Sequence, residues 1–520
     1  MEKAQVFSTQ LAEDTCIQRD GDKEAVITET SGEWTLPDYL PEIRKILRVS
    51  SRILPEGRFV SGGRAEFAGS VCHTVIYSDG EGGIVSSSHT SDYEFSVPVP
   101  TDSAGATVSA DTVLGHVSYR LGGPRKISIR ATVHATPHVR YDAIIPKTLA
   151  SAGDDVERLS HAHLSSRTLT STGHETTLAD SFTLDGYGTE NVKVIFCDGK
   201  VLVNEARAVE GGVVCRGEAT VRCIYCPENG SAFSLVRRIP FEETVAVEGA
   251  NATHNATAYG SIGSVDVALS GQGNATVMMD AAMSLTASTY TNDKITLTDD
   301  MYSTKCEYEC VYEDMPIESF LGSAMSSFTL DGSGEDTKNE TVLSVIDTDA
   351  RLDIKEVVAE NGRAVVKGNC CVSVLATVAS DLPKTQYCSF EYSIPFSRET
   401  DLRAHEGAML DCRGEAVGAK ARIDTKGISF EVQCSLTVTA HERKSVKNLC
   451  GATPIPCENN DTDADLTVCY PMGATLWQIA KKYRVHPSEL CEQNGIGKEI
   501  ADEPDSPISL DGITSLIIEK

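Results

Sequence analysis

The chain has 520 residues, of which 41% are hydrophobic, so we expect several globular domains rather than one core. Its 75 acidic and 46 basic side chains give a net charge of −29, which opposes binding to nucleic acid or to an anionic membrane and favours neutral or basic partners. The 41 Gly and only two Trp favour turn-rich β structure over long helices. We see no apolar stretch long enough to span a membrane and expect no export signal at the start of the chain.

Residues that could act in catalysis or bind metal, Cys and His, are numerous but scattered along the chain. The 17 Cys are an odd number, and without an export signal we interpret them as reduced thiols that act as small hydrophobic residues. The lone CxxC at Cys223 and Cys226 and the close pair His161 and His163 lack the partner residues that a metal or catalytic site needs. We therefore predict no catalytic residues, no metal site and no cofactor, and expect that the protein is not an enzyme.

An internal repeat with a period of about 150 residues organises most of the chain. Three anchors recur in the same order in each copy: an apolar-Thr-Leu triplet, a Gly that opens a strand-like run, and a Pro between apolar residues. In this order the anchors begin at Trp34, Gly69 and Pro98, at Phe182, Gly217 and Pro240, and at Phe328, Gly368 and Pro395.

Each copy ends in a strongly alternating segment. In the third copy the apolar members are Phe430, Val432, Cys434, Leu436 and Val438, which alternation places on one face of a strand. Turn pairs such as Asn-Gly at residues 361–362 predict tight hairpins. We therefore predict a mainly β fold of three tandem antiparallel β-sandwich-like repeat domains followed by a small βααβ domain. The expected boundaries are residues 1–152, 153–300 and 301–450 for the repeats, 451–466 for an acidic linker and 467–520 for the last domain.

The first copy departs from the other two between Thr35 and Leu47, where it reads TLPDYLPEIRKIL. Its two prolines predict an extended entry, and Ile43, Ile46 and Leu47 then follow at helical spacing. Two interpretations stay open: a Pro-bounded turn that packs on the first sheet, and a partner-binding element.

The last 50 or so residues predict a strand, two short helices and a closing strand. Thr475 and Gln478 stand in the capping-box relation, so the first helix should begin at Leu476. The other expected elements are a strand at residues 467–470, a second helix at 487–493 that ends near Asn494 and Gly495, and a strand at 516–518.

The run TVCYPMGATLWQIA, together with Leu490, Asn494 and Gly495, resembles a LysM domain. LysM domains bind N-acetylglucosamine polymers in a groove between the first strand-to-helix loop and the loop after the second helix. Ala474 replaces the usual Asp, and residues 497–510 are longer and more acidic than the family pattern, which favours a protein over a glycan as ligand. For Trp477, packing in the small core and a partner hot spot both stay open. The resemblance implies a partner- or glycan-binding site at Gly473, Ala474, Thr475, Leu476, Trp477, Asn494, Gly495 and Ile496.

The repeats and the tail together are similar to the SPOCS-domain family of spore coat morphogenesis proteins, and the run from Leu36 to Ile43 carries part of that resemblance. It implies a non-enzymatic scaffold or adaptor in the mother-cell cytoplasm, at the forespore surface and spore coat. Such a protein would dock through its LysM-like domain on a SpoIVA-like coat ATPase or other coat proteins. The alternative is a peptidoglycan- or N-acetylglucosamine-binding protein anchored to cortex or cell wall. Self-association through β-sheet edges is a further hypothesis.

Overall fold

The chain is mainly β, as predicted, and its sheets are antiparallel. No helix among the described residues is long and apolar enough to cross a membrane. The computed structural model describes residues 15–21, 24–54, 57–79, 81–100, 106–145, 155–171, 173–228, 230–271, 273–334, 340–380, 385–425, 427–455, 466–497, 499–506 and 513–519.

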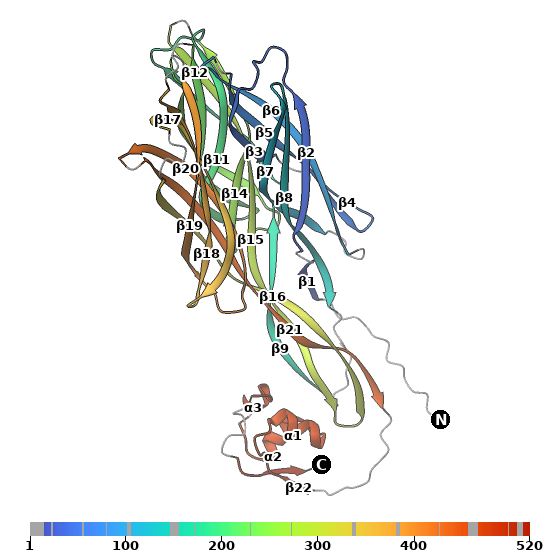
Figure 1. The fold of residues 1–520 in the computed structure, drawn as a ribbon. Coiled ribbons are helices and arrows are strands. Elements are labelled where there is room, and N and C mark those ends of the chain that lie inside the picture. The colour runs from blue at the N-terminus through green and yellow to red at the C-terminus, as the bar shows by residue number, and fades with distance from the viewer. Residues whose placement is uncertain are drawn as a thin grey trace.

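The body is built from three units with the same strand order, residues 15–145, 156–303 and 307–455 (Figure 1). In each unit, three strands close in sequence form one sheet, and the strands before and after them form a second sheet. In the second unit the sheets run β11-β12-β13 and β10-β15-β14, with β9 paired to the far end of β15. Its strands are β9 (Val156–Thr170), β10 (His174–Leu184), β11 (Val192–Val209), β12 (Gly212–Pro227), β13 (Phe233–Ala246), β14 (Asn255–Ser270) and β15 (Ala275–Ser303).

The first and third units repeat this plan with small variations. In the first unit two positions are each split into two short strands, whereas in the third unit one long strand, β16, replaces the pair β9 and β10. The first unit comprises β1 (Thr15–Asp20), β2 (Val26–Thr35), β3 (Lys45–Ile53), β4 (Gly57–Ser61), β5 (Arg64–Ser78), β6 (Ile84–Pro98), β7 (Thr107–Gly123) and β8 (Lys126–Ile145). The third comprises β16 (Glu307–Gly334), β17 (Val342–Glu360), β18 (Arg363–Val378), β19 (Gln386–Arg403), β20 (Met409–Asp424) and β21 (Gly427–Ile455).

The alternating segments form the inner faces of these units, because their apolar residues all point to one side of the strand. Phe430, Val432, Cys434, Leu436 and Val438 are each at most 4% exposed and pack against the other sheet of the third unit. The Asn-Gly hairpin also forms: Asn361 and Gly362 join β17 to β18 with φ of 52° and 79°, the left-handed pair that a tight two-residue turn requires.

Two sequence expectations meet a different structure. The helical spacing of Ile43, Ile46 and Leu47 does not produce a helix, because residues 45–53 are strand β3, with a bulge that turns Leu47 away from the unit's own core. Strands β15 and β21 also run on to Ser303 and Ile455, past the expected boundaries at 300 and 450. Most of the predicted linker, residues 456–465, lies outside the described residues.

A β-bulge repeated in all three units joins one unit to the next. The bulged residues are Leu47, Ile195 and Ile346, in strands β3, β11 and β17. A bulge leaves a backbone group outside the ladder, and the Ile195 and Ile346 carbonyls accept hydrogen bonds from the hydroxyls of Ser86 and Ser234, which occupy equivalent positions in the preceding units. At the remaining seam, Lys45 of the first unit donates to a backbone carbonyl of the third, at 3.3 Å. The three tandem units therefore close into a ring.

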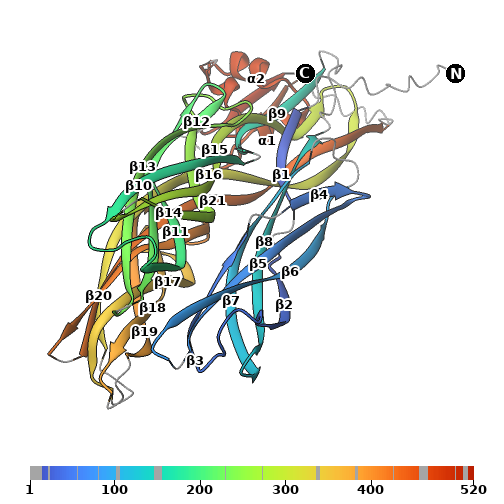
Figure 2. The same cartoon turned by 90° about the horizontal axis from the view of Figure 1, so that it is seen from above.

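Two apolar clusters seal the junction between the units. The first contains Ile76, Ile224 and Leu375, which hold the same position in each unit, together with the bulge residues Leu47 and Ile346. The second joins the long strand extensions at the other end of the body: Ile17 and Ile145 from the first unit, Ile295 and Leu297 from the second, and Met315 and Ile317 from the third. Seen from above, the first unit lies beside the other two (Figure 2).

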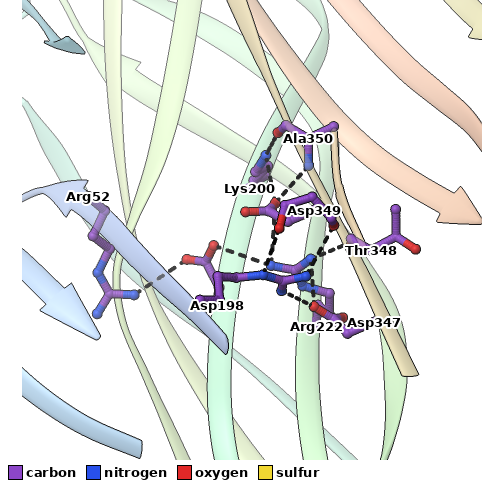
Figure 3. Close-up of polar contacts among 10 residues, drawn as sticks. Arg52, Asp198, Lys200, Arg222, Asp347, Thr348, Asp349 and Ala350 are labelled. Atoms are coloured by element: carbon purple, nitrogen blue, oxygen red, sulfur yellow. Dashed lines mark hydrogen bonds and ion pairs between the residues drawn. The ribbon is translucent and has the colours of Figure 1, made fainter. Parts of the chain in front are cut away.

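A network of ion pairs lies beside the first cluster, between the units (Figure 3). Asp347 of the third unit pairs with Arg48 of the first and, at 3.2 Å, with Arg222 of the second. Arg222 also lies 3.3 Å from Asp349 and 3.9 Å from Asp198. Burial alone would raise the pKa of Asp349, but Arg222 and nearby cations hold it well below its usual range. These charges are paired, as burial requires.

A small C-terminal module, residues 466–519, lies at the end of the body near β9, β16 and β21 (Figure 1). Its order of strand, two helices and strand follows the sequence prediction, and one extra helical turn, α3, precedes the last strand. The elements are β22 (Leu466–Cys469), α1 (Leu476–Tyr483), α2 (Pro487–Gln493), α3 (Glu499–Asp502) and β23 (Leu516–Glu519).

Candidate functional site

The helices of the C-terminal module begin and end where the sequence predicts. The Thr475 side chain accepts from the Gln478 backbone N–H and the Gln478 side chain accepts from the Thr475 backbone N–H, so the predicted capping box is confirmed. Arg484 ends α1 in the left-handed conformation, with φ of 56°, and Gly495 follows α2 with φ of 65°. Leu476, Ile479, Ala480, Leu490 and Leu516 form the small core that these elements enclose.

Among the described residues, the two edges of the module's two-stranded sheet differ. On the far side of β23, Asn494 donates to the Ile517 carbonyl and accepts from the Ile517 N–H, both at 2.6 Å. Gln493 makes the same pair of contacts with the backbone of Glu519, at 3.1 and 3.2 Å. These two amide side chains therefore take the place of a third strand. No strand among the described residues pairs with the far side of β22.

The outer face of this sheet is apolar and exposed. Val468 lies directly opposite Ile517, and alternation places Leu466 and Tyr470 on the same face. Met472, in the turn after β22, is 95% exposed. Each of the other four side chains is at least 43% exposed. We call these five residues, Leu466, Val468, Tyr470, Met472 and Ile517, the apolar face. Exposed apolar clusters of this kind commonly mark contact surfaces.

The sequence-predicted site residues differ in burial. Leu476 and Trp477 are buried in the module's core, and Thr475 is also buried at the helix cap. Asn494 is half-buried and holds the edge of β23. Gly473 and Gly495 are exposed, whereas Ala474 and Ile496 are half-buried.

The described part of the segment after α2 packs against the first predicted groove loop. The Pro504 carbonyl accepts the Trp477 backbone N–H at 2.8 Å, and the Thr475 hydroxyl donates to Asp505 at 3.1 Å. Ile500 and Ala501 of α3 pack in the same cluster as Ala474 and Ile496. The extra residues noted in the sequence thus fold against both sides of the groove. The part of that segment at residues 507–510 lies outside the described residues.

Trp477 contacts the body as well as the module's core. Its indole N–H donates to Asp300 of β15 at 2.9 Å, and its ring meets Tyr302 edge-on, with centroids 4.9 Å apart. The Tyr302 hydroxyl donates to the Val485 carbonyl at 2.7 Å. Trp477 is therefore buried, at 3% exposed, between the module's core and the body of its own chain, as the packing interpretation expects. Its role as a hot spot for a partner protein stays a prediction.

Polar contacts of one polarity surround this contact: two ion pairs and a histidine–carboxylate contact. Lys481, Arg484 and His486 of the module meet Asp300, Glu307 and Glu157 of the body. Lys481 lies 2.6 Å from Asp300. Burial alone would raise the pKa of Asp300, but hydrogen bonds from Lys481 and Trp477 hold the pKa below its usual value. Burial raises the pKa of Tyr302 well above its ordinary value, so its hydroxyl remains a donor.

Sequence reasoning missed these body residues. Glu157, Asp300 and Glu307 occur in ordinary polar stretches, and no local pattern marks them. The contact joins strands β9, β15 and β16, which are distant in sequence from the module, so only the folded chain brings them together. Among the described residues, no group of three His, Cys, Asp or Glu side chains is arranged to hold a metal ion.

Part of the second unit matches a known family model. Residues 192–270 match the family model described as SipL, SPOCS domain. The matched segment begins with the first residue of β11 and ends with the last residue of β14, so it covers one complete sheet of the second unit and one strand of the other sheet. No curated protein matches the chain.

Proposed function

We propose that this chain is a non-enzymatic scaffold of spore coat assembly that docks on a SpoIVA-like coat ATPase through its C-terminal module. The family match at residues 192–270 supports a role in spore coat morphogenesis. The first and third units share the strand order of the matched unit, which supports three SPOCS-like units. The C-terminal module is interpreted as LysM-like on its element order and sequence pattern. The site of action is then the forespore surface, in the mother-cell cytoplasm.

The observation that carries the docking proposal is the apolar face beside the open edge of β22. An extended segment of the partner would pair with the β22 backbone and cover Leu466, Val468 and Tyr470. The opposite face of the module already contacts its own body through Trp477 and Lys481, so the partner meets the module from the free side. The contact that we propose therefore lies on β22 and the following turn rather than in the groove.

Binding of the purified full chain to a purified SpoIVA-like ATPase tests the proposal. We expect Val468→Glu and Met472→Glu each to weaken binding at least tenfold, because a charge would be buried without a partner. Phe59→Glu is the control, since Phe59 is also an exposed apolar residue, at 65%, but lies on strand β4 of the first unit. Wild-type binding that survives both module substitutions, or that is lost equally with Phe59→Glu, would contradict this docking mode.

The glycan-binding alternative has less support. The segment that carries α3 contacts both sides of the predicted groove, and Asn494 is engaged with β23. Sedimentation of the full chain with cell-wall sacculi, followed by competition with chitin oligomers, measures this activity directly. If the chain sediments with the sacculi and chitin oligomers abolish this sedimentation, the glycan interpretation would be supported.

A further inference from the structure

The loop from Leu36 to Ile43, between β2 and β3, presents one aromatic side chain to solvent. Its ends are buried: Leu36 and Ile43 pack with Val75 and Tyr77 in the core of the first unit. Its tip is not, and Tyr39 is 84% exposed. A turn that packs on the first sheet therefore explains the buried ends of the loop, but it does not explain why Tyr39 is exposed.

Many contacts hold this loop in one conformation. The Arg125 guanidinium donates to the carbonyls of Pro37 and Leu40, at 2.6 and 3.0 Å. The Tyr77 hydroxyl donates to the Pro41 carbonyl at 3.0 Å, and the Leu40 N–H donates to the Pro37 carbonyl at 3.0 Å. The two prolines further restrict the backbone. The loop is therefore ordered before any partner binds. A partner would not have to offset the conformational entropy lost in ordering it, which favours binding.

The second unit provides an internal comparison. Tyr187 follows Leu184 by the same three residues that separate Tyr39 from Leu36. There the chain turns through Gly186, with φ of 84°, and the Tyr187 ring packs on Phe233 with centroids 5.1 Å apart. The same position thus points inward in the second unit and outward in the first. A tyrosine at this position can pack inside the unit, as Tyr187 does, so the fold itself does not require Tyr39 to be exposed.

The acidic residues on either side of Tyr39 favour a partner with basic side chains. Asp38 and Glu42 are both exposed, and the nearest cation to Asp38 in an ion pair is Arg125, at 4.0 Å. The tip is therefore an aromatic side chain between two carboxylates. A chain of net charge −29 disfavours a second copy of itself as the partner, and the carboxylates disfavour nucleic acid and anionic membrane.

We infer that the Leu36–Ile43 loop is a second docking element, in which Tyr39 enters a pocket of a partner protein whose rim carries Lys or Arg side chains that pair with Asp38 and Glu42. This contact is separate from the module's apolar face: it lies in the first unit, on the connection between β2 and β3. The chain would then hold two proteins at once, one by each element.

Site-specific photo-crosslinking of the full chain in sporulating cells tests this inference. The photoreactive residue p-benzoylphenylalanine replaces Tyr39 and, as a matched control, Tyr119, which is 51% exposed on β7. We expect a protein crosslinked from position 39 only, through a surface rich in Lys and Arg. The double substitution Asp38→Asn, Glu42→Gln should lower its yield at least fivefold, whereas Met472→Glu should leave it unchanged.

A synthetic peptide that spans the crosslinked surface then serves as a defined probe. Tyr39→Ala should weaken its binding to the full chain at least tenfold, since buried aromatic anchors dominate such contacts, and Tyr119→Ala should not change it. The inference is overturned if both positions give the same crosslinks or if position 39 gives none. It is also overturned if the crosslinked surface is neutral or acidic, or if the charge substitutions leave the crosslinking yield unchanged. Loss of crosslinking with Met472→Glu would instead assign the contact to the module's partner and overturn the second element.

Discussion

Arg48 and Asp347 occupy the same position in the first and third units, and they form an ion pair with each other. Each directly follows the bulged residue of its strand, and each lies opposite the equivalent apolar residue of the central strand, Ile76 or Leu375. Two copies of one repeat have therefore acquired opposite charges at the point where they meet. The second unit has Phe196 at this position and contributes Arg222 from the neighbouring strand instead.

Removal of the Asp347 carboxylate should destabilise the body strongly. We expect Asp347→Ala to lower the free energy of unfolding by about 3 to 5 kcal/mol, because Arg48 and Arg222 would remain buried without this partner. Chemical denaturation followed by circular dichroism measures the change. Asp401→Ala is the control, since Asp401 is fully exposed in its pair with Arg363 and should change stability by less than about 0.5 kcal/mol. Equal effects of the two substitutions would show that the network contributes nothing specific.

Loss of Asp300 should release the C-terminal module from the body. In a Trp34→Phe background Trp477 is the single Trp, because the chain has two. We expect Asp300→Ala to shift Trp477 emission to longer wavelength and to speed proteolytic cleavage between body and module, since both the indole N–H and Lys481 lose their acceptor. Glu309→Gln, at an exposed position of β16, should leave both signals unchanged. An unshifted spectrum for Asp300→Ala would mean that the apolar contact with Tyr302 suffices for docking.

Acidification should weaken the first unit through His73. This side chain is fully buried between the hydroxyls of Ser51 and Ser91, at 2.8 and 3.0 Å, and burial lowers its pKa from 6.5 to about 4. The unfolded chain therefore binds a proton first as pH falls, so stability present above pH 6.5 is lost between pH 6.5 and about 4, by up to about 3 kcal/mol.

Denaturation curves of the wild type and of His73→Gln across this pH range test the effect. Glutamine does not titrate, so its curve should be flatter than that of the wild type over the same interval. Parallel losses of stability in both proteins would assign the acid sensitivity to other groups.

Asn494 should matter for the closing strand more than for any ligand. Its side chain bonds the Leu490 carbonyl and both backbone groups of Ile517, so Asn494→Ala removes three hydrogen bonds. We expect the module to lose about 2 to 3 kcal/mol and the Ile517 amide to exchange faster with deuterium. Glu492→Ala, two residues earlier at an exposed position of α2, is the matched control. Unaltered exchange at Ile517 would show that pairing with β22 alone holds the strand.

Local sequence patterns predicted the strands and helices well because those elements obey local rules. Alternation at Phe430 to Val438 and the capping box at Thr475 each describe neighbours in the chain, and both appear in the structure as predicted. The same reasoning failed at Ile43 to Leu47, where helical spacing arose from a buried loop end followed by a β-bulge.

Contacts between units were beyond sequence reasoning for a physical reason. Arg48 and Asp347 are 299 positions apart, and neither stands in a motif. The docking of Trp477 on Asp300 likewise depends on how far β15 extends beyond its unit, which alternation alone does not fix. For the candidate site, the sequence identified the module and its loops, whereas the apolar face depends on which side of β22 the helices cover.

The closed ring also fixes how many repeats the protein can have. A solenoid has two open ends, so its length can grow or shrink by whole repeats. Here the Lys45 contact joins the third unit back to the first, and the bulge carbonyls of the second and third units are each taken by a serine of the unit before. A fourth copy inserted by duplication would find no vacant neighbour. We therefore expect change in such chains to be tolerated in loops and at the C-terminal module, while the number of units stays at three.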